Sequence, residues 1–280
     1  MFSVVFPGQG SQEVGMGKIF YDRYDLVKNY FKDADETLNF PISKLILEGP
    51  KSDLDLTFNT QPAIFLISYS IFNVIKKEFN IDLNKADFFA GHSLGEYTAL
   101  SCAGYIKFSD TLKILKLRGE AMQNSVPKGI GGMIAILATT IKKVETIISS
   151  NKNCNVQIAN DNSEGQIVVS GKLKDLDFFA EILKSQGIRN IKLPVSAPFH
   201  CKLMSEATKI MRDEINKIEF NKGYNVLMSN VTADSIKNIP DIKNLLTEQI
   251  ESRVRWRESI INMTNNGVNN FIEIGPGKVL

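Results

Sequence analysis

Residues 88–95, Phe-Phe-Ala-Gly-His-Ser-Leu-Gly, are the stretch from which the fold of this chain can be inferred. The first three form a short apolar run typical of a buried strand, and the residues from Leu94 to Ala103 predict a helix. Between strand and helix, Gly91 to Gly95 match the pattern G-x-S-x-G. In a strand-turn-helix setting this pattern is typical of a nucleophile elbow, a sharp turn that exposes a serine hydroxyl. The sequence therefore predicts an α/β protein with Ser93 at such a turn.

Glycines on both sides of Ser93 suit the chemistry of an elbow. Because they lack a Cβ, Gly91 and Gly95 allow the backbone to turn sharply. The turn would hold the Ser93 hydroxyl near the free N–H groups of a helix N-terminus, which stabilise a developing anion. A plain glycine turn with a capping serine needs the same residues, so the pattern alone leaves both interpretations open.

A serine nucleophile requires a base, and the sequence contains two histidines. His92 adjoins Ser93, and the side chains of neighbouring residues on a tight turn point apart. His200, in the segment Pro-Phe-His at 198–200, is therefore the candidate base. No aspartate or glutamate stands out as a third member, and a backbone carbonyl is the alternative that would orient the imidazole.

Composition excludes several other classes of protein. The 280 residues are 43% hydrophobic and 23% charged, with a net charge of +2, which is typical of a globular protein and does not indicate a nucleic-acid binder. Three scattered cysteines without a CxxC pair favour a reducing cytoplasm over a zinc site or a disulfide framework. The N-terminus lacks the features of a signal peptide. The uncharged stretch 56–75 has an apolar part of only about ten residues, which predicts a buried helix rather than a membrane span.

Outside the elbow, strands and helices alternate. Val4–Phe6 predicts a strand, and a helix is expected from about Phe20 to Thr37. Thr60 is predicted to cap a central helix with Pro62 in its first turn. A further helix is expected over 109–123, and the C-terminal part predicts helices from about 202, 241 and 257 with strands at 225–228 and 271–274.

The pattern changes after 127–132, Pro-Lys-Gly-Ile-Gly-Gly, which is the best linker in the chain. Short strands are predicted at 133–137, 156–159, 166–170 and 191–195, and helices at 142–149 and 173–185. The order β-α-β-β-α-β is that of ferredoxin-like domains. The sequence thus predicts a small domain, residues 127–196, inserted into a large α/β domain formed by 1–126 and 197–280.

Two other segments are ambiguous. The stretch 7–12, Pro-Gly-Gln-Gly-Ser-Gln, matches neither G-x-G-x-x-G nor G-x-x-x-x-G-K, so it indicates either a loop of backbone N–H groups or an ordinary turn rather than a phosphate site. Arg118, followed by a glycine, is only a hint of anion binding.

Three arginines flank the single tryptophan, Trp256. Arg253, Arg255 and Arg257 form a basic cluster with an aromatic residue, which in other contexts suggests nucleic acid. The chain lacks a basic field or a known motif, so the cluster is interpreted as the solvated start of a helix.

Six motifs together resemble those of the malonyl-CoA:acyl carrier protein transacylases. They are PGQGSQ, TQPAIF, GHSLGEYTAL, LRGEAMQ, PFH and EIGPGKVL, in the order and at the spacing of that family, from residue 3 to residue 280. The resemblance implies an α/β-hydrolase-like large domain with a ferredoxin-like insertion, which agrees with the organisation predicted from the elements.

The resemblance also implies roles for individual residues. Ser93 is expected to accept the acyl group and His200 to act as its base. The backbone N–H groups of Gln9 and Leu94 are expected to form the oxyanion hole, and Arg118 to pair with the malonyl carboxylate. Gln249 matches a glutamine whose backbone carbonyl holds the histidine, and Asn160 and Asn230 match two asparagines near the site. Phe199 matches the position at which a bulky residue accompanies malonyl preference in related acyltransferases.

The predicted function is transfer of a malonyl group from malonyl-CoA to the phosphopantetheine thiol of acyl carrier protein, through a malonyl-serine intermediate, for fatty-acid chain elongation. No metal or other cofactor is expected, nor a nucleic-acid or membrane partner, and the chain is expected to be a cytoplasmic monomer. The sequence does not separate a fatty-acid from a polyketide pathway. Two alternatives share parts of the pattern: a serine hydrolase such as an esterase or thioesterase, and a non-catalytic module that docks carrier protein.

Overall fold

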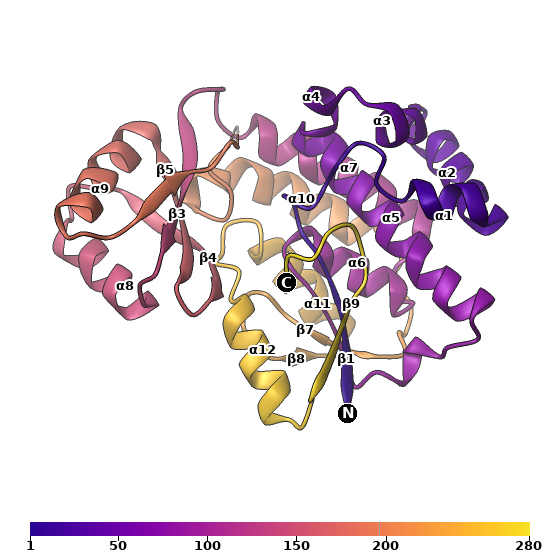
Figure 1. Ribbon diagram of the computed structural model, residues 1–280. Coiled ribbons are helices and arrows are strands. Elements are labelled where there is room, and N and C mark those ends of the chain that lie inside the picture. The colour runs from indigo at the N-terminus through magenta and orange to yellow at the C-terminus, as the bar shows by residue number, and fades with distance from the viewer. Residues whose placement is uncertain (196) are drawn as a thin grey trace.

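The structure is a computed structural model that describes residues 1–195 and 197–280. Ser196, the last residue of the predicted insertion, lies outside the described residues. Within them the strands form two separate sheets, and helices pack against both (Figure 1). The α/β class predicted from the elbow is confirmed.

The larger sheet carries the elbow. Its strands are β1 (Phe2–Phe6), β2 (Phe88–Gly91), β7 (Val226–Met228), β8 (Ser235–Ile236) and β9 (Asn270–Glu273). The order is β8-β7-β2-β1-β9, and neighbours run parallel except at the edge strand β8. Val4 and Phe6 of β1 pack into the main core while Val5 packs into a second cluster on the other face, because successive side chains of a strand point to opposite faces. Phe6 pairs with Gly91, so the two central strands end together beneath the elbow.

Helices cover both faces of this sheet. The second cluster contains Trp256 and Met263 of one C-terminal helix, and the main core contains most of the others. The helices are α1 (Lys18–Arg23), α2 (Asp25–Leu38), α3 (Ile42–Glu48), α4 (Lys51–Leu54), α5 (Thr57–Glu78), α6 (Leu94–Cys102), α7 (Phe108–Asn124), α10 (Ser205–Lys217), α11 (Ile239–Glu248) and α12 (Trp256–Asn265), with short 3-10 helices η1 (Leu83–Lys85) and η2 (Lys202–Met204).

Two sequence predictions in the N-terminal part are wrong. The helix expected over 20–37 is divided at Tyr24, whose extended backbone (φ −122°, ψ 119°) separates α1 from α2. The central helix α5 begins at Thr57, so Thr60 is not its cap; the Thr60 hydroxyl instead donates to the carbonyl of Leu54 at 2.6 Å. Residues 63–67 are buried, as predicted for a core helix, and no helix in the described parts of the chain is long and apolar enough to cross a membrane.

The smaller sheet is antiparallel, with strand order β4-β5-β3-β6. Its elements follow the predicted order: β3 (Gly131–Leu137), α8 (Ile141–Ser150), β4 (Val156–Ser163), β5 (Gln166–Lys172), α9 (Leu173–Ser185) and β6 (Asn190–Lys192). Ile134, Ile136 and Val169 form a core with α8 and α9, whereas Met133 and Val168, which alternate with them, belong to the main core. This sheet therefore presents one face to its own helices and the other toward the larger unit.

Strand β4 also contacts the large unit directly, through the segment before α12. Val254, just before α12, pairs with Asn160 as an isolated parallel bridge; the Val254 N–H donates to Ala159 at 2.8 Å, and the Asp161 N–H donates to Val254 at 2.9 Å. Arg257 of α12 then holds the fully buried Asp161 carboxylate by two parallel bonds, Nε to Oδ1 at 3.0 Å and Nη2 to Oδ2 at 2.8 Å.

The interpretation of the arginine cluster as a solvated helix start is therefore wrong for Arg257. Its partner lies 96 residues earlier in the chain. Arg253 bonds to Glu145 and Glu258, and Arg255 also pairs with Glu258. Through Arg253 and Arg257 the cluster fastens the small unit to the large one instead of facing only solvent.

Replacing Arg257 by methionine is expected to lower the free energy of unfolding by about 3 kcal/mol, because the buried Asp161 carboxylate loses its ionic partner. The matched control is Arg253→Met, which removes the partner of Glu145, a side chain 52% exposed, and leaves Glu258 paired with Arg255; it should cost about 1 kcal/mol or less. Urea denaturation of both variants measures the difference. Equal losses would show that the Arg257–Asp161 pair contributes no more than a surface pair.

Candidate active site

The turn between β2 and α6 is so tight that side chains are excluded on both sides of Ser93. A Cβ on Gly91 would lie 1.9 Å from the carbonyl carbon of Gly95, and a Cβ on Gly95 would lie 2.3 Å from the carbonyl oxygen of Phe6. Ser93 itself has φ 55° and ψ −108°, a conformation that costs energy for a residue with a side chain. Backbone strain of this kind concentrates at functional sites, where the surrounding structure imposes it.

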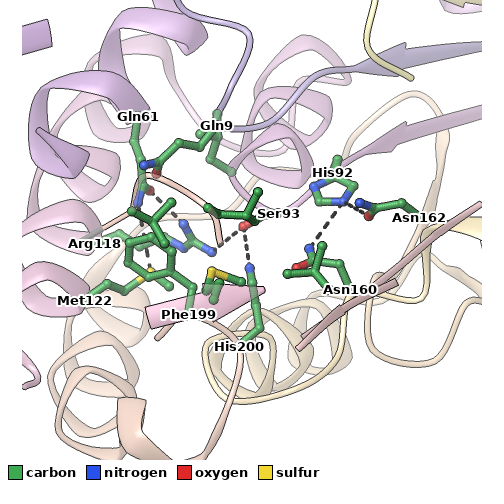
Figure 2. Close-up of a pocket in the computed structure, with 15 residues that line it drawn as sticks. Gln9, Gln61, His92, Ser93, Arg118, Met122, Asn160, Asn162, Phe199 and His200 are labelled. Carbon is green, nitrogen blue, oxygen red and sulfur yellow. Dashed lines mark hydrogen bonds between the residues drawn. The ribbon is translucent and has the colours of Figure 1, made fainter. Parts of the chain in front are cut away.

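The hydroxyl of Ser93 meets the imidazole of His200. Ser93 Oγ lies 2.8 Å from His200 Nε2, and His200 Nδ1 lies 2.9 Å from the carbonyl oxygen of Gln249 (Figure 2). Because a carbonyl only accepts, Nδ1 carries the proton, and Nε2 accepts from the hydroxyl. His92 points to the other side and bonds to Asn162 at 2.8 Å. The structure thus brings together the serine and the histidine that the sequence singled out, with a backbone carbonyl behind the histidine.

His200 is held in its neutral form. Burial lowers its pKa to about 3, and the positive charge of Arg118 acts in the same direction. The hydrogen bond to the Gln249 carbonyl opposes the shift without cancelling it. A neutral imidazole is the form that can take a proton from Ser93.

Arg118, from α7, projects its guanidinium to within hydrogen-bond distance of Ser93. The side chain is buried and donates to Gln61 Oε1 at 2.7 Å, to Ser93 Oγ at 3.1 Å and to Gln249 Oε1 at 2.8 Å. Its Nε has no hydrogen-bond partner, and no acidic side chain among the described residues lies within ion-pairing distance. A buried cation without a carboxylate partner is costly, so this site is prepared for an anion.

Two residues behind the elbow hold its backbone. Asn230 accepts from the Ser93 N–H at 2.7 Å and donates to the Gly91 carbonyl at 2.7 Å. The Gln249 side chain donates to the Ser93 carbonyl at 3.0 Å and to the carboxylate of Glu96 at 2.7 Å. The sequence analysis assigned a role to the backbone carbonyl of Gln249 but not to its side chain. It did not select Glu96, although Glu96 lies in the GHSLGEYTAL motif with Ser93.

A cavity of about 150 Å³ opens in front of Ser93. Seven of the nine residues expected at the site line it: Gln9, Ser93, Leu94, Arg118, Asn160, Phe199 and His200. Gln249 and Asn230 lie behind it, in contact with Ser93. In the described residues the backbone N–H groups of Gln9 and Leu94 have no hydrogen-bond acceptor, so both remain available to a ligand.

The cavity walls contain residues that sequence reasoning did not select. Gln61 and Met122 lie near Arg118, while Asn162 lies beside His92 on the opposite side of Ser93 (Figure 2). Gln61 stands in the TQPAIF motif, which was the available signal. The Asn160 amide lies 3.4 Å from His92 Nε2. The carbonyl of Phe199 accepts from the Ser170 hydroxyl at 2.6 Å, which fixes the backbone beside His200.

These features define an α/β protein with a serine–histidine pair at a strained elbow and a buried cation beside it. A family model described as acyl transferase domain matches residues 3–280. The malonyl CoA-acyl carrier protein transacylase of Bacillus subtilis (strain 168) is 44% identical over 99% of this chain and 87% of the relative.

Solved structures agree with this match. An acyl-carrier-protein-S-malonyltransferase from Bartonella henselae superposes with a TM-score of 0.96, at 40% identity over 99% of this chain and 89% of that one. A malonyl-transacylase solved in complex with a type II polyketide synthase acyl-carrier protein superposes with a TM-score of 0.95, at 34% identity over 99% and 90%. The chain belongs to the acyl transferase domain family and, within it, to the malonyl-CoA:acyl carrier protein transacylases. The family and the enzyme class predicted from the six motifs are confirmed.

The lowered pKa of His200 predicts an unusual pH profile. The value of kcat/KM for acylation of Ser93, which reports the free enzyme, should stay constant from pH 8 to below about pH 5, because the imidazole stays neutral where an ordinary histidine, with a pKa of 6.5, is protonated. Glu96, whose pKa burial raises to about 7, is the other group that could titrate in this range, so Glu96→Gln is the matched control. An inflection near pH 6.5 that persists in both proteins would contradict the assignment.

Proposed function

We propose that this enzyme transfers a malonyl group from coenzyme A to the phosphopantetheine thiol of acyl carrier protein through a malonyl-Ser93 ester, for fatty-acid chain elongation. The names of its relatives support the acyl group and both partners. The single observation that carries the proposal is Arg118, a buried guanidinium without an acidic partner in the described structure, in the wall of the cavity that holds Ser93. Malonyl differs from acetyl by a free carboxylate. Such a carboxylate would supply the anionic partner that the Arg118 guanidinium does not have.

In the first half-reaction His200 Nε2 takes the hydroxyl proton as Ser93 Oγ bonds to the thioester carbon. The C–S bond then breaks, and the proton passes from Nε2 to the sulfur, so coenzyme A leaves as a thiol. The Gln249 carbonyl keeps the other proton on Nδ1 throughout. The enzyme is left as a neutral imidazole beside a malonyl ester.

The second half-reaction reverses these steps with a different thiol. The phosphopantetheine thiol gives its proton to His200 Nε2 as its sulfur bonds to the ester carbon. The bond from carbon to Ser93 Oγ breaks, and the serine recovers the proton. In both halves the N–H groups of Gln9 and Leu94 would donate to the oxyanion, since both line the cavity and have no other acceptor in the described residues.

The other site residues would set the shape of the cavity. Asn230 and Gln249 would hold the elbow through the bonds that they make to the backbone of Ser93. Asn160 would line the cavity beside His92, whose Nε2 donates to Asn162 Oδ1 and is held by that bond. The ring of Phe199, buried in the cavity wall, would limit the space for a branched acyl group and so favour malonyl.

The two sheets would correspond to two domains of known type. The larger unit, residues 1–126 and 197–280, would be the α/β-hydrolase-like domain. The smaller unit, residues 127–196, would be the ferredoxin-like one, an assignment supported by its β-α-β-β-α-β order and its sheet order β4-β5-β3-β6. The active-site cavity takes residues from both units.

We also retain the predictions of a cytoplasmic monomer that works without metal or other cofactor, malonyl-CoA being the substrate. Cys102, Cys154 and Cys201 are free and buried, which fits a reducing compartment. In the described parts of the chain no group of three or more His, Cys, Asp and Glu side chains is arranged to hold a metal ion.

Ser93→Ala is expected to abolish the covalent malonyl adduct, because the elbow then has no nucleophile. The measurement is intact-protein mass spectrometry after mixing with malonyl-CoA. In the wild type, adding carrier protein should move the acyl group to its thiol faster than water releases it. Release to water at the same rate would identify a serine hydrolase, and an undiminished adduct on Ser93→Ala would remove the serine assignment.

Arg118→Ala should lower kcat/KM for malonyl-CoA by about 2–4 kcal/mol, or roughly 30- to 1,000-fold, because the acyl carboxylate loses its cation. Acetyl-CoA should lose much less. Arg118→Lys, which keeps the charge but not the planar pair of donors, should fall between the two. The comparison of both substrates in all three proteins decides the role: equal losses for malonyl and acetyl would indicate a structural arginine.

A further inference from the structure

Glu96 is a buried carboxylate that none of the steps above uses. It lies in the first turn of α6 and is 2% exposed. No lysine or arginine in the described residues forms an ion pair with it, although the charge of Arg118 acts on it. Since a buried carboxylate is costly unless it is hydrogen-bonded, the partners of Glu96 indicate why it is there.

The carboxylate joins two segments that are far apart in the chain. Its Oε2 accepts from the side-chain amide of Gln249 at 2.7 Å and from the backbone N–H of Asn230 at 3.2 Å. Gln249 follows α11, and Asn230 follows β7. Both residues also bond to the backbone of Ser93, so Glu96 is the acceptor shared by the two residues that hold the elbow.

The contact with Gln249 determines which way round its amide lies. Nε2 uses its two hydrogens on the Ser93 carbonyl and on Glu96, and Oε1 accepts from Arg118 at 2.8 Å. With the amide reversed, Oε1 would face the Glu96 carboxylate, and neither group could donate a hydrogen bond. Nε2 would face the guanidinium, and neither group could accept one. Glu96, together with the Ser93 carbonyl, therefore favours the orientation in which Gln249 supports the guanidinium.

Arg118 depends on this support for its direction. The Nη2 group that donates to Gln249 also donates to Ser93 Oγ at 3.1 Å. The second anchor, Gln61, holds Nη1 from the other end. Loss of the Gln249 acceptor would leave one side of the guanidinium free to turn away from the acyl site.

We propose that Glu96 is a positioning residue for malonyl selectivity, which acts by fixing the amide of Gln249 and through it the guanidinium of Arg118. The proposal rests on the proposed function, because selectivity for malonyl is what the guanidinium would provide. It separates the role of the Gln249 side chain, which serves Arg118, from that of its backbone carbonyl, which serves His200.

This role requires an acceptor rather than a charge. Burial raises the pKa of Glu96 to about 7, while Gln249, Asn230 and Arg118 oppose the shift, so both protonation states occur near neutral pH. A protonated carboxyl still has a carbonyl oxygen that can accept both hydrogen bonds. A glutamine at position 96 offers the same acceptor at the same reach, whereas an aspartate keeps the carboxylate but withdraws it by one methylene.

The test compares Glu96→Gln with Glu96→Asp. The quantity measured is the ratio of kcat/KM for malonyl-CoA to that for acetyl-CoA in the acylation of Ser93. We expect Glu96→Gln to keep this ratio within about threefold of the wild type and Glu96→Asp to lower it at least tenfold. The Gln249→Ala variant keeps the backbone carbonyl that bonds to His200. When Glu96→Asp is added to this variant, the ratio should change by less than twofold.

Three outcomes would overturn the proposal. The first is an unchanged ratio in Glu96→Asp, including one in which both substrates lose equally, as they would if Glu96 were merely structural. The second is a ratio in Glu96→Gln that falls as far as in Glu96→Asp. The third is an undiminished effect of Glu96→Asp on the Gln249→Ala background. A wild-type enzyme without preference for malonyl would instead contradict the proposed function, so the two failures can be told apart.

Discussion

The close approach of three backbone segments at the elbow is the constraint on which the rest of the site depends. Gly91 and Gly95 let β2 and α6 meet without a Cβ between them, and a Cβ on Gly8 would lie 2.7 Å from the carbonyl oxygen of His92. Ser93 and His200 both have positive φ, 55° and 57°, which residues with side chains rarely adopt. Such conformations persist when the surroundings impose them, and here the side chains behind the elbow bond directly to the Ser93 backbone.

The second requirement is that the two sheets stay together, since each contributes walls to one cavity. Met133 and Val168 reach it from the small sheet, and Arg118 reaches it from α7. The bridge between Asn160 and Val254 and the pair between Arg257 and Asp161 hold β4 against the large unit. On β4, Asp161 faces Arg257 while its neighbours Asn160 and Asn162 approach His92, because alternate residues of a strand face opposite ways.

Local sequence patterns were sufficient to predict most secondary-structure elements and the position of Ser93, because the strand, the glycine turn and the helix of the elbow are adjacent in the sequence. Elimination was sufficient to select His200, because the chain has two histidines. Contacts between residues far apart in the chain could not be predicted from the sequence. Arg257 was interpreted as solvated because nothing near it in the sequence indicates Asp161. Glu96 was not selected because the groups that donate hydrogen bonds to it lie more than a hundred residues later. The start of α5 was also wrong, since Thr60 has the residue type of a cap but lies inside the helix. The roles of Gln9 and Leu94 rested on the resemblance, and for Arg118 the residues themselves gave no more than a hint of anion binding.

The Gln249 carbonyl stands where other serine enzymes use a carboxylate, and this choice suits transfer between thiols. A carbonyl fixes the imidazole but does not neutralise an imidazolium, so the protonated form of His200 stays unfavourable beside Arg118. A thiolate is a good leaving group and needs little help from an acid, so a weakly basic histidine is enough for thioester chemistry. In the proposed reaction the malonyl carboxylate pairs with Arg118 and offsets its charge, and the pKa of His200 rises as a result. The acyl group that fits the cation would therefore also strengthen the base that attacks it, whereas acetyl would leave His200 as weak as it is in the empty site.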